Sequence, residues 1–274
     1  MRGISMPLNS KSMIRILFLG DVVGEPGRRA LSERLRELQD ELAVDFTIIN
    51  GENAAGGRGI SGKQSIELLK AGATVITTGD HVWDQRDLPS YIDSEPRLLR
   101  PCNYPAGTPG SGSVVLETPK GPVAVLSVRG QTFLSPPLED PFRRAAEEVE
   151  LLRDSARVIF VDVHAETTSE KIAMGRYLDG RVSAVVGTHT HVQTADEQIF
   201  PGGTAFLCDA GMCGAVDSIL GRTKESVLQR FLTSMPTKLP VAGGKIRLCG
   251  ACVDINEVTG KALAIKRVQE VVNL

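Results

Sequence analysis

The sequence predicts a layered α/β sandwich built as a single domain. Over the first two-thirds of the chain, short apolar runs alternate with helical stretches. Continuous apolar runs of this kind are typical of strands that crossover helices bury on both faces. The last third adds further strands, and no internal repeat, low-complexity tract or linker divides the chain. A length of 274 residues is ample for one large core, so a split into two domains is not required.

The expected strands follow from these apolar runs. Five buried strands are predicted at residues 14–19, 46–49, 75–77, 158–163 and 183–186. A hairpin of residues 114–117 and 123–128 is predicted because a Thr-Pro-Lys-Gly-Pro turn separates two β-rich runs. The C-terminal strands are expected at residues 204–208, 245–255 and 262–271.

The expected helices lie between these strands. They are predicted at residues 28–43, 62–71, 141–153 and 223–232. In the first of them, Leu31, Leu35 and Leu38 recur at helical spacing and form one apolar face. Residues 1–13 carry two cations but no apolar h-region, so we expect a flexible extension ahead of a domain at residues 14–274.

Charge and cysteine content exclude several classes of protein. Lys and Arg number 31 and Asp and Glu number 33, so no global field and no clear nucleic-acid surface are expected. No apolar run approaches the ~18 residues that a membrane span needs. The odd number of five cysteines suits a reduced cytoplasm better than a disulfide framework. Cys249 and Cys252 form one C-x-x-C, which we interpret as strand residues because no second pair completes a zinc site.

The polar residues that stand out share one position, directly after a predicted buried strand. They are Asp21, Glu52, Asn53, Asp80, His81, His164, His189 and His191. In open α/β sheets, ligands bind in the crevice outside the carboxyl ends of the strands. These side chains should therefore face one crevice. A lone histidine at a strand end is more often structural, but all four histidines of the chain lie at such ends.

This donor set favours a metal site. Imidazole, carboxylate and amide ligands without thiolate suit Mn, Fe, Co, Ni or Zn. His189 and His191 on an extended segment would point both rings to one side. A glycine precedes each of Asp21, Glu52 and Asp80, which allows the backbone to turn sharply there.

Glycine-rich segments allow other interpretations. Gly20, Gly24 and Gly27 match neither G-x-G-x-x-G nor a P-loop, and we expect them to shape the Asp21 turn and the following helix start. The segment 56–59, Gly-Gly-Arg-Gly, is either a wall of the site or a flexible loop. No Ser or Cys lies in a recognisable nucleophile elbow.

In this order the motifs resemble those of the calcineurin-like metallophosphoesterases, and more closely those of the YmdB-type bacterial branch. The segments that carry the resemblance are 20–24 (Gly-Asp-Val-Val-Gly), 77–81 (Thr-Thr-Gly-Asp-His), 164–171 (His-Ala-Glu-Thr-Thr-Ser-Glu-Lys) and 187–191 (Gly-Thr-His-Thr-His). The match runs from about residue 14 to the C-terminus. It implies a four-layer α/β/β/α sandwich, a dinuclear metal centre and phosphodiesterase activity on cyclic nucleotides, of the 2′,3′ or 3′,5′ kind.

The resemblance also implies residue roles. The implied ligands are Asp21, Glu52 and His191 at one ion and Asp80, His164 and His189 at the other, with Asn53 as a further ligand. Glu52 would bridge the ions, which we expect to be Fe or Mn, with Zn, Co and Ni as alternatives. A hydroxide that bridges the metals would attack phosphorus, and His81 would be the general acid.

Two positions depart from the wider pattern. Val23 stands where the superfamily has the histidine of Asp-x-His, and Asn53 is the expected replacement. Asp80 stands where the related pattern has Asn. Two divalent ions would then face three carboxylates and one hydroxide, so this centre should hold metal more tightly and attract an anionic phosphate less.

Several further residues have two open interpretations. Possible supports of the imidazoles, or simply caps and turn residues, are Asp162, Thr190, Thr194, Asp196 and Asp209. Glu166 and Lys171 either approach substrate or lie on a solvated loop. Arg58 and Arg129 are the best candidates for phosphate contact.

Two other functions remain open. One is a phosphomonoesterase of nucleotidase type with the same centre, and the other is a regulatory protein that binds a nucleotide with little turnover. The expected partner is in each case a small phosphodiester or nucleotide. The sequence leaves open whether the chain forms a homo-oligomer.

Overall fold

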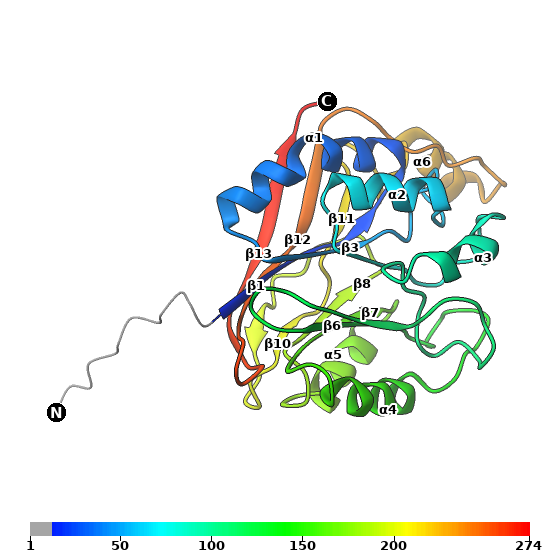
Figure 1. Cartoon of the computed structure of the whole chain (residues 1–274). Helices are drawn as coiled ribbons and strands as arrows, with labels where there is room; N and C mark the ends of the chain where they lie inside the picture. The colour runs from blue at the N-terminus through cyan, green and yellow to red at the C-terminus, as the bar shows by residue number, and fades with distance from the viewer. Residues whose placement is uncertain (1–12) are drawn as a thin grey trace.

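Two β-sheets face each other at the centre of the protein, and helices cover their outer faces (Figure 1). The computed structural model describes residues 13–274. The predicted extension therefore lies outside the described residues, except for Met13, which begins the first strand. No helix in this part of the chain is long and apolar enough to cross a membrane.

The first sheet has seven strands. Their order is β2 (Asp21–Val22), β11 (Met212–Ala215), β12 (Ile246–Asn256), β1 (Met13–Leu19), β3 (Phe46–Asn50) and β4 (Val75–Thr77), with β13 (Ala262–Val272) paired to β12. Strands β1, β3 and β4 are parallel, and β12 runs antiparallel to β1. The carboxyl ends of β1, β3 and β4 therefore meet at one edge.

The second sheet has six strands. Their order is β5 (Ser113–Leu116), β6 (Val123–Arg129), β7 (Val158–His164), β8 (Ala184–Thr188), β10 (Ala205–Leu207) and β9 (Gln198–Ile199). Strands β5 and β6 form the predicted antiparallel hairpin, and β6, β7 and β8 are parallel.

Helices complete four layers, as the resemblance implied. Helices α1 (Gly24–Leu42) and α2 (Gly62–Ala71) pack on the first sheet, and α4 (Pro141–Arg153) and α5 (Thr168–Tyr177) pack on the second (Figure 1). The inner core joins the two sheets, and in it the rings of Phe18 and Phe160 stack with centroids 5.1 Å apart. The remaining helical elements are α3 (Leu88–Tyr91), the 3₁₀ helix η2 (Ile92–Ser94) and α6 (Lys224–Thr233).

Three sequence predictions need correction. Helix α1 begins at Gly24 rather than at residue 28. Gly24 and Gly27 therefore lie inside the helix and not in the turn before it. Helix α5 was not predicted, since its sequence carries almost no apolar periodicity. The short elements β2, β9, β11 and α3 were also missed, because an element of two to four residues leaves too little pattern to detect.

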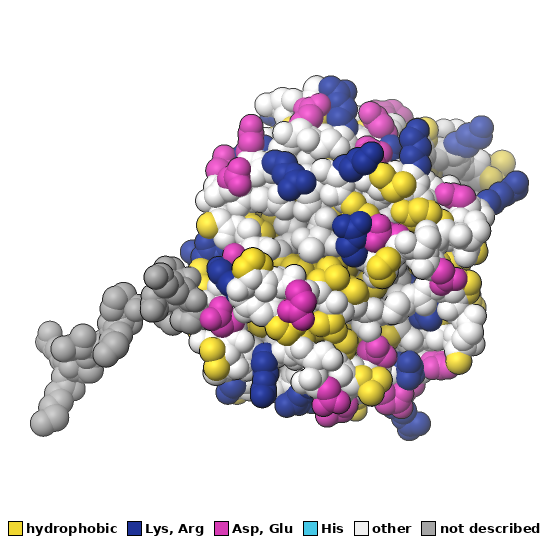
Figure 2. Space-filling model, viewed as in Figure 1, with side chains coloured by type: hydrophobic (Ala, Val, Ile, Leu, Met, Phe, Trp, Pro, Cys, Tyr) yellow, Lys and Arg dark blue, Asp and Glu magenta, His cyan; other side chains and the backbone are white. Residues whose placement is uncertain are grey.

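The surface agrees with the balanced composition. On the face in Figure 2, acidic and basic side chains are interspersed and a band of apolar side chains crosses the middle.

Candidate metal centre

The predicted polar residues gather at the carboxyl edges of both sheets. Asp21 follows β1, Asp80 follows β4 after a two-residue turn, and His164 ends β7. The structure also brings Glu52, Asn53, His81, His189 and His191 to this place. Loops from separate parts of the chain thus come together outside the carboxyl ends of the strands, where ligands bind in open α/β sheets.

One group of donors surrounds the buried ring of His164. Its Nε2 lies 3.0 Å from Asp80 Oδ1 and 3.0 Å from His189 Nδ1. The distance between His189 Nδ1 and Asp80 Oδ1 is 3.4 Å. These three ligand atoms lie within 4.8 Å of one another, which is a spacing that a single cation can bridge.

A second group surrounds Asp21. Its Oδ1 lies 3.9 Å from His191 Nε2 and 3.9 Å from His164 Nδ1. His191 Nε2 is in turn 3.0 Å from Asn53 Oδ1. Asp21 Oδ1 is fully buried and has no hydrogen-bond partner among the described residues. A buried carboxylate oxygen without a partner is unfavourable, so this atom fits a bound cation.

Glu52 lies beside His164 and Asp80. Its carboxylate accepts hydrogen bonds from the backbone amides of Gly79 and His81, and its Oε1 is 3.8 Å from His164 Nε2. Burial raises the pKa of Glu52 well above its usual range, and the nearby charge of Asp80 raises it further. Two carboxylates packed this closely repel each other unless a cation separates them. The donor set therefore fits divalent metal.

The pKa of Asp80 shifts in the opposite direction to that of Glu52. Burial raises its pKa, but hydrogen bonds from His164 and His189 outweigh that effect and hold the pKa of Asp80 below its usual range. Asp80 therefore remains an anion next to Glu52.

The route of the His-x-His segment differs from the prediction. Strand β8 ends at Thr188, and both His189 (φ 97°) and His191 (φ 65°) lie in the left-handed region. The two rings reach the centre because the backbone turns sharply, not because they share one side of an extended strand. Such conformations are strained in residues with a side chain, and they cluster at functional sites.

His81 lies at the edge of this centre. Its Nδ1 is 3.1 Å from Asp84 Oδ2 and 3.7 Å from Asp80 Oδ2. Burial lowers the pKa of His81. A cavity of about 400 Å³ opens above the centre and is lined by His81, His189, His191, Asn53, Arg58 and Arg222, among others.

A buried hydrogen-bond network orients His164. Its Nδ1 is 3.0 Å from the hydroxyl of Thr188, which donates a 2.7 Å hydrogen bond to Asp162. Asp162 also accepts hydrogen bonds from Asn50 and Thr77. Burial raises the pKa of Asp162 to about 7. Of the suggested supporting residues, Asp162 thus supports an imidazole indirectly, through the hydroxyl of Thr188.

A second network holds the turn between His189 and His191. Asp209 accepts hydrogen bonds from the backbone amide and the hydroxyl of Thr190, at 3.1 and 2.7 Å. Lys171 Nζ lies 2.7 Å from Asp209, and both side chains are buried. The interpretation of Lys171 as a solvated or substrate-facing residue is therefore wrong. Its charge is compensated inside the protein.

The other suggested residues have separate positions. Thr194 bonds to the backbone of Asp209, and Asp196 accepts from the amide of Cys208, so neither contacts an imidazole directly. Glu166 Oε2 lies 2.9 Å from His189 Nε2, a contact that the sequence did not predict. A carboxylate on the outer nitrogen of a metal-ligating histidine typically fixes the orientation of the ring.

Of three arginines near the centre, Arg58 and Arg222 line the cavity and Arg129 is buried, and Arg222 was not predicted from the sequence. Arg58 lines the cavity and forms an ion pair with Asp84. Arg129 is fully buried and donates to the carbonyl of Pro136, so it does not line the cavity. Arg222 donates to the carbonyls of Gly56 and Gly57 and thereby holds the glycine-rich segment as a wall of the cavity.

The cysteines take no part in this centre. All five are free, and Cys249 and Cys252 lie on β12 as ordinary strand residues. The groups of metal-binding spacing in the described residues contain only Asp, Glu and His.

Known proteins resemble this chain over nearly its whole length. A family model described as "YmdB-like protein" matches residues 17–268. The 2′,3′-cyclic-nucleotide 2′-phosphodiesterase of Bacillus subtilis (strain 168) is 49% identical over 93% of this chain and 96% of its own. The crystal structure of a novel phosphatase from Mycoplasma pneumoniae superposes with a TM-score of 0.89 at 34% identity, over 95% of this chain and 94% of that one. A hypothetical protein from Thermus thermophilus gives a TM-score of 0.86 at 41% identity, over 94% of this chain and 99% of that one.

Proposed function

This chain belongs to the YmdB-like family, and we propose that it is a metal-dependent phosphodiesterase that hydrolyses 2′,3′-cyclic nucleotides. The observation that carries the proposal is the buried Asp21 oxygen, which has no hydrogen-bond partner among the described residues and lies 3.9 Å from each of two imidazoles. The substrate class comes from the Bacillus subtilis relative at 49% identity.

Seven side chains would hold two metal ions. Asp21, Asn53 and His191 would hold one ion, Asp80, His164 and His189 would hold the other, and Glu52 would be shared. We propose Fe or Mn for these sites, with Zn, Co and Ni as alternatives. When bound, such ions polarise phosphoryl oxygens and lower the pKa of water.

His81 would act as general acid on the leaving oxygen. Asp84 Oδ2 lies 3.1 Å from Nδ1 of the ring, and Nε2 would donate the proton when the ring is charged. His81 also lines the cavity in which substrate would lie.

Arg58 would neutralise the phosphate of the substrate. Its side chain is about two-thirds exposed, at 66%, and stands at the cavity beside His81 and Asp84. Arg222 would act differently, because its guanidinium is occupied by the carbonyls of the cavity wall.

A substrate comparison on metal-replete protein tests the proposal. Metal content is measured by elemental analysis, and rates are compared for 2′,3′-cyclic AMP, 3′,5′-cyclic AMP, 3′-AMP and the synthetic pair bis-p-nitrophenyl phosphate and p-nitrophenyl phosphate. We expect 2′,3′-cyclic AMP to be the fastest nucleotide and a chelator to abolish its hydrolysis. Faster hydrolysis of the monoesters would instead identify a phosphomonoesterase, and tight nucleotide binding without turnover would identify a regulatory binding protein.

A further inference from the structure

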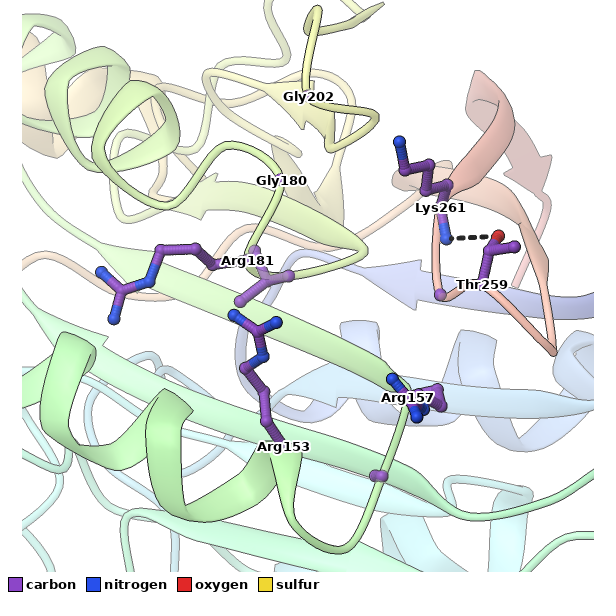
Figure 3. Close-up of a pocket in the computed structure, with 10 residues that line it drawn as sticks. Arg153, Arg157, Gly180, Arg181, Gly202, Thr259 and Lys261 are labelled. Carbon is purple, nitrogen blue, oxygen red and sulfur yellow. Dashed lines mark hydrogen bonds between the residues drawn. The ribbon is translucent and has the colours of Figure 1, made fainter.

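A small cavity with a strongly basic lining lies at the amino edge of the second sheet, opposite the edge that carries the metal centre (Figure 3). Its charged lining residues are Arg153, Arg157, Arg181 and Lys261. Its volume is about 70 Å³, several times the ~10–15 Å³ that a cavity needs to hold one water molecule.

This cavity is separate from the metal centre. Arg157 directly precedes β7, whereas His164 ends that strand. Seven residues at ~3.3 Å each place the two ends of β7 about 20 Å apart. A ligand in the basic cavity therefore cannot contact the metal ligands.

The positive charge of the lining is only partly compensated. Glu150 Oε1 lies 2.9 Å from Arg181 and 4.0 Å from Arg153, so one carboxylate serves two guanidinium groups. Among the described residues, Arg157 and Lys261 form no ion pair. The lining itself contains no acidic residue. A cluster of like charges is unfavourable until an anion joins it.

Close backbone packing brings Lys261 next to Arg157. The turn between β12 and β13 contains Gly260 at φ 70°, and a Cβ there would lie 2.2 Å from the carbonyl oxygen of Arg157. Only glycine allows this approach. Figure 3 shows Arg153 at the end of α4 and Arg157 on the connection from α4 to β7, with Lys261 on the separate turn between β12 and β13. Their juxtaposition is therefore built by the fold.

The side chains, rather than the backbone, would supply the donors. The amides of Gly180 and Gly202, which also line the cavity, already donate to Thr204 and Asp179. Guanidinium groups present paired N–H donors that match phosphate oxygens.

We propose that this cavity binds a phosphate group, at a second site distinct from the metal centre. The cavity has room for a phosphate group and is open to solvent. The group can therefore come from inorganic phosphate or from a nucleoside monophosphate whose nucleoside stays outside the cavity.

Site-resolved chemical labelling tests the proposal. The metal-loaded protein is treated with phenylglyoxal in chloride, in inorganic phosphate or in adenosine 3′-monophosphate at equal ionic strength, and modified arginines are quantified by mass spectrometry. At a ligand concentration about ten times Kd, Arg153, Arg157 and Arg181 should be modified about tenfold more slowly. Arg230, exposed on α6, is the internal control.

Protection by either phosphate compound supports the site and identifies its source. Equal labelling in all three solutions overturns it. As a second measurement, the Arg157→Ala/Lys261→Ala double variant should bind one phosphate fewer per chain in equilibrium dialysis, while Lys63→Ala on α2 should match wild type. An unchanged stoichiometry in the double variant would also overturn the proposal.

Discussion

The two ends of β7 lie in regions of opposite chemistry. At the carboxyl edge, His164 is buried, and its ring nitrogens contact Asp80, His189 and Thr188. At the amino edge, Arg157 and Lys261 are exposed on flexible stems. A buried donor is held in one geometry by many contacts, whereas a solvated cation is not. Substitutions at the carboxyl edge should therefore have much larger effects on catalysis and stability.

Removing the carboxylate of Asp21 from the centre should give the largest effect. Asp21→Asn preserves the size of the side chain and an acceptor for the amide of His189. It removes the charge that the cation site requires. Since a metal ion contributes several kcal/mol to such a transition state, we expect a loss of at least about 10⁴-fold in kcat/KM. Elemental analysis should show reduced metal content, and full metal with full activity would contradict the assignment of Asp21.

His81→Ala separates acid catalysis from metal binding at the same edge. General acid catalysis typically contributes about 10²–10⁴-fold, and we expect kcat on a cyclic nucleotide to fall by that amount. Metal content should stay at the wild-type level. The effect should shrink on bis-p-nitrophenyl phosphate, because p-nitrophenolate leaves without a proton. An equal loss on both substrates would remove the acid role from His81.

Substitution of one lysine at each edge compares the two edges by their effect on the free energy of unfolding. Lys171→Met breaks the buried pair with Asp209 and should reduce the free energy of unfolding by about 3–5 kcal/mol, because it leaves a buried carboxylate without its partner. Lys261→Met at the basic cavity should change the free energy of unfolding by no more than about 0.5 kcal/mol. Urea denaturation monitored by circular dichroism measures both. Similar changes in the free energy of unfolding for the two variants would contradict the expected difference between the edges.

Glu166→Gln tests the outer contact of His189. Loss of the carboxylate at 2.9 Å should reduce metal affinity by about 10–100-fold, since such partners orient the ligating ring. Glu170→Gln is a matched control, because that carboxylate accepts only from the amides of Gln131 and Thr132 among the described residues. Competition with a metal-binding dye measures the affinity. Equal losses in both variants would show that Glu166 has no special role.

Asp80→Asn should have the smallest effect. Removing one negative charge leaves the centre more positive, so KM for an anionic phosphodiester should fall several-fold. Metal binding should weaken at the same time, because His164 and His189 lose an anionic neighbour. Steady-state kinetics at saturating metal separate these effects. An unchanged or higher KM with metal content intact would refute the charge count.

The sequence predicted which residues come together but not the backbone conformation that brings each of them there. The long strands, and the polar residues that follow them, could be predicted from apolar runs that end in polar residues, as for Asp21 and His164. The extended geometry expected for His189 and His191 was wrong, because left-handed backbone at both residues depends on Asp209 and Lys171 holding the turn. Helix α5 escaped prediction because its helical pattern is set by tertiary contacts rather than by an apolar stripe.

The sequence by itself determined the layered α/β class and the residue types that stand at each strand end, because both are written in local order along the chain. Only the tertiary structure decided the partners of those residues. Lys171 with Asp209, Arg222 with Gly57 and Glu166 with His189 join distant or independently placed segments. Such contacts form when the sheets pack and loops close, so no local pattern encodes them.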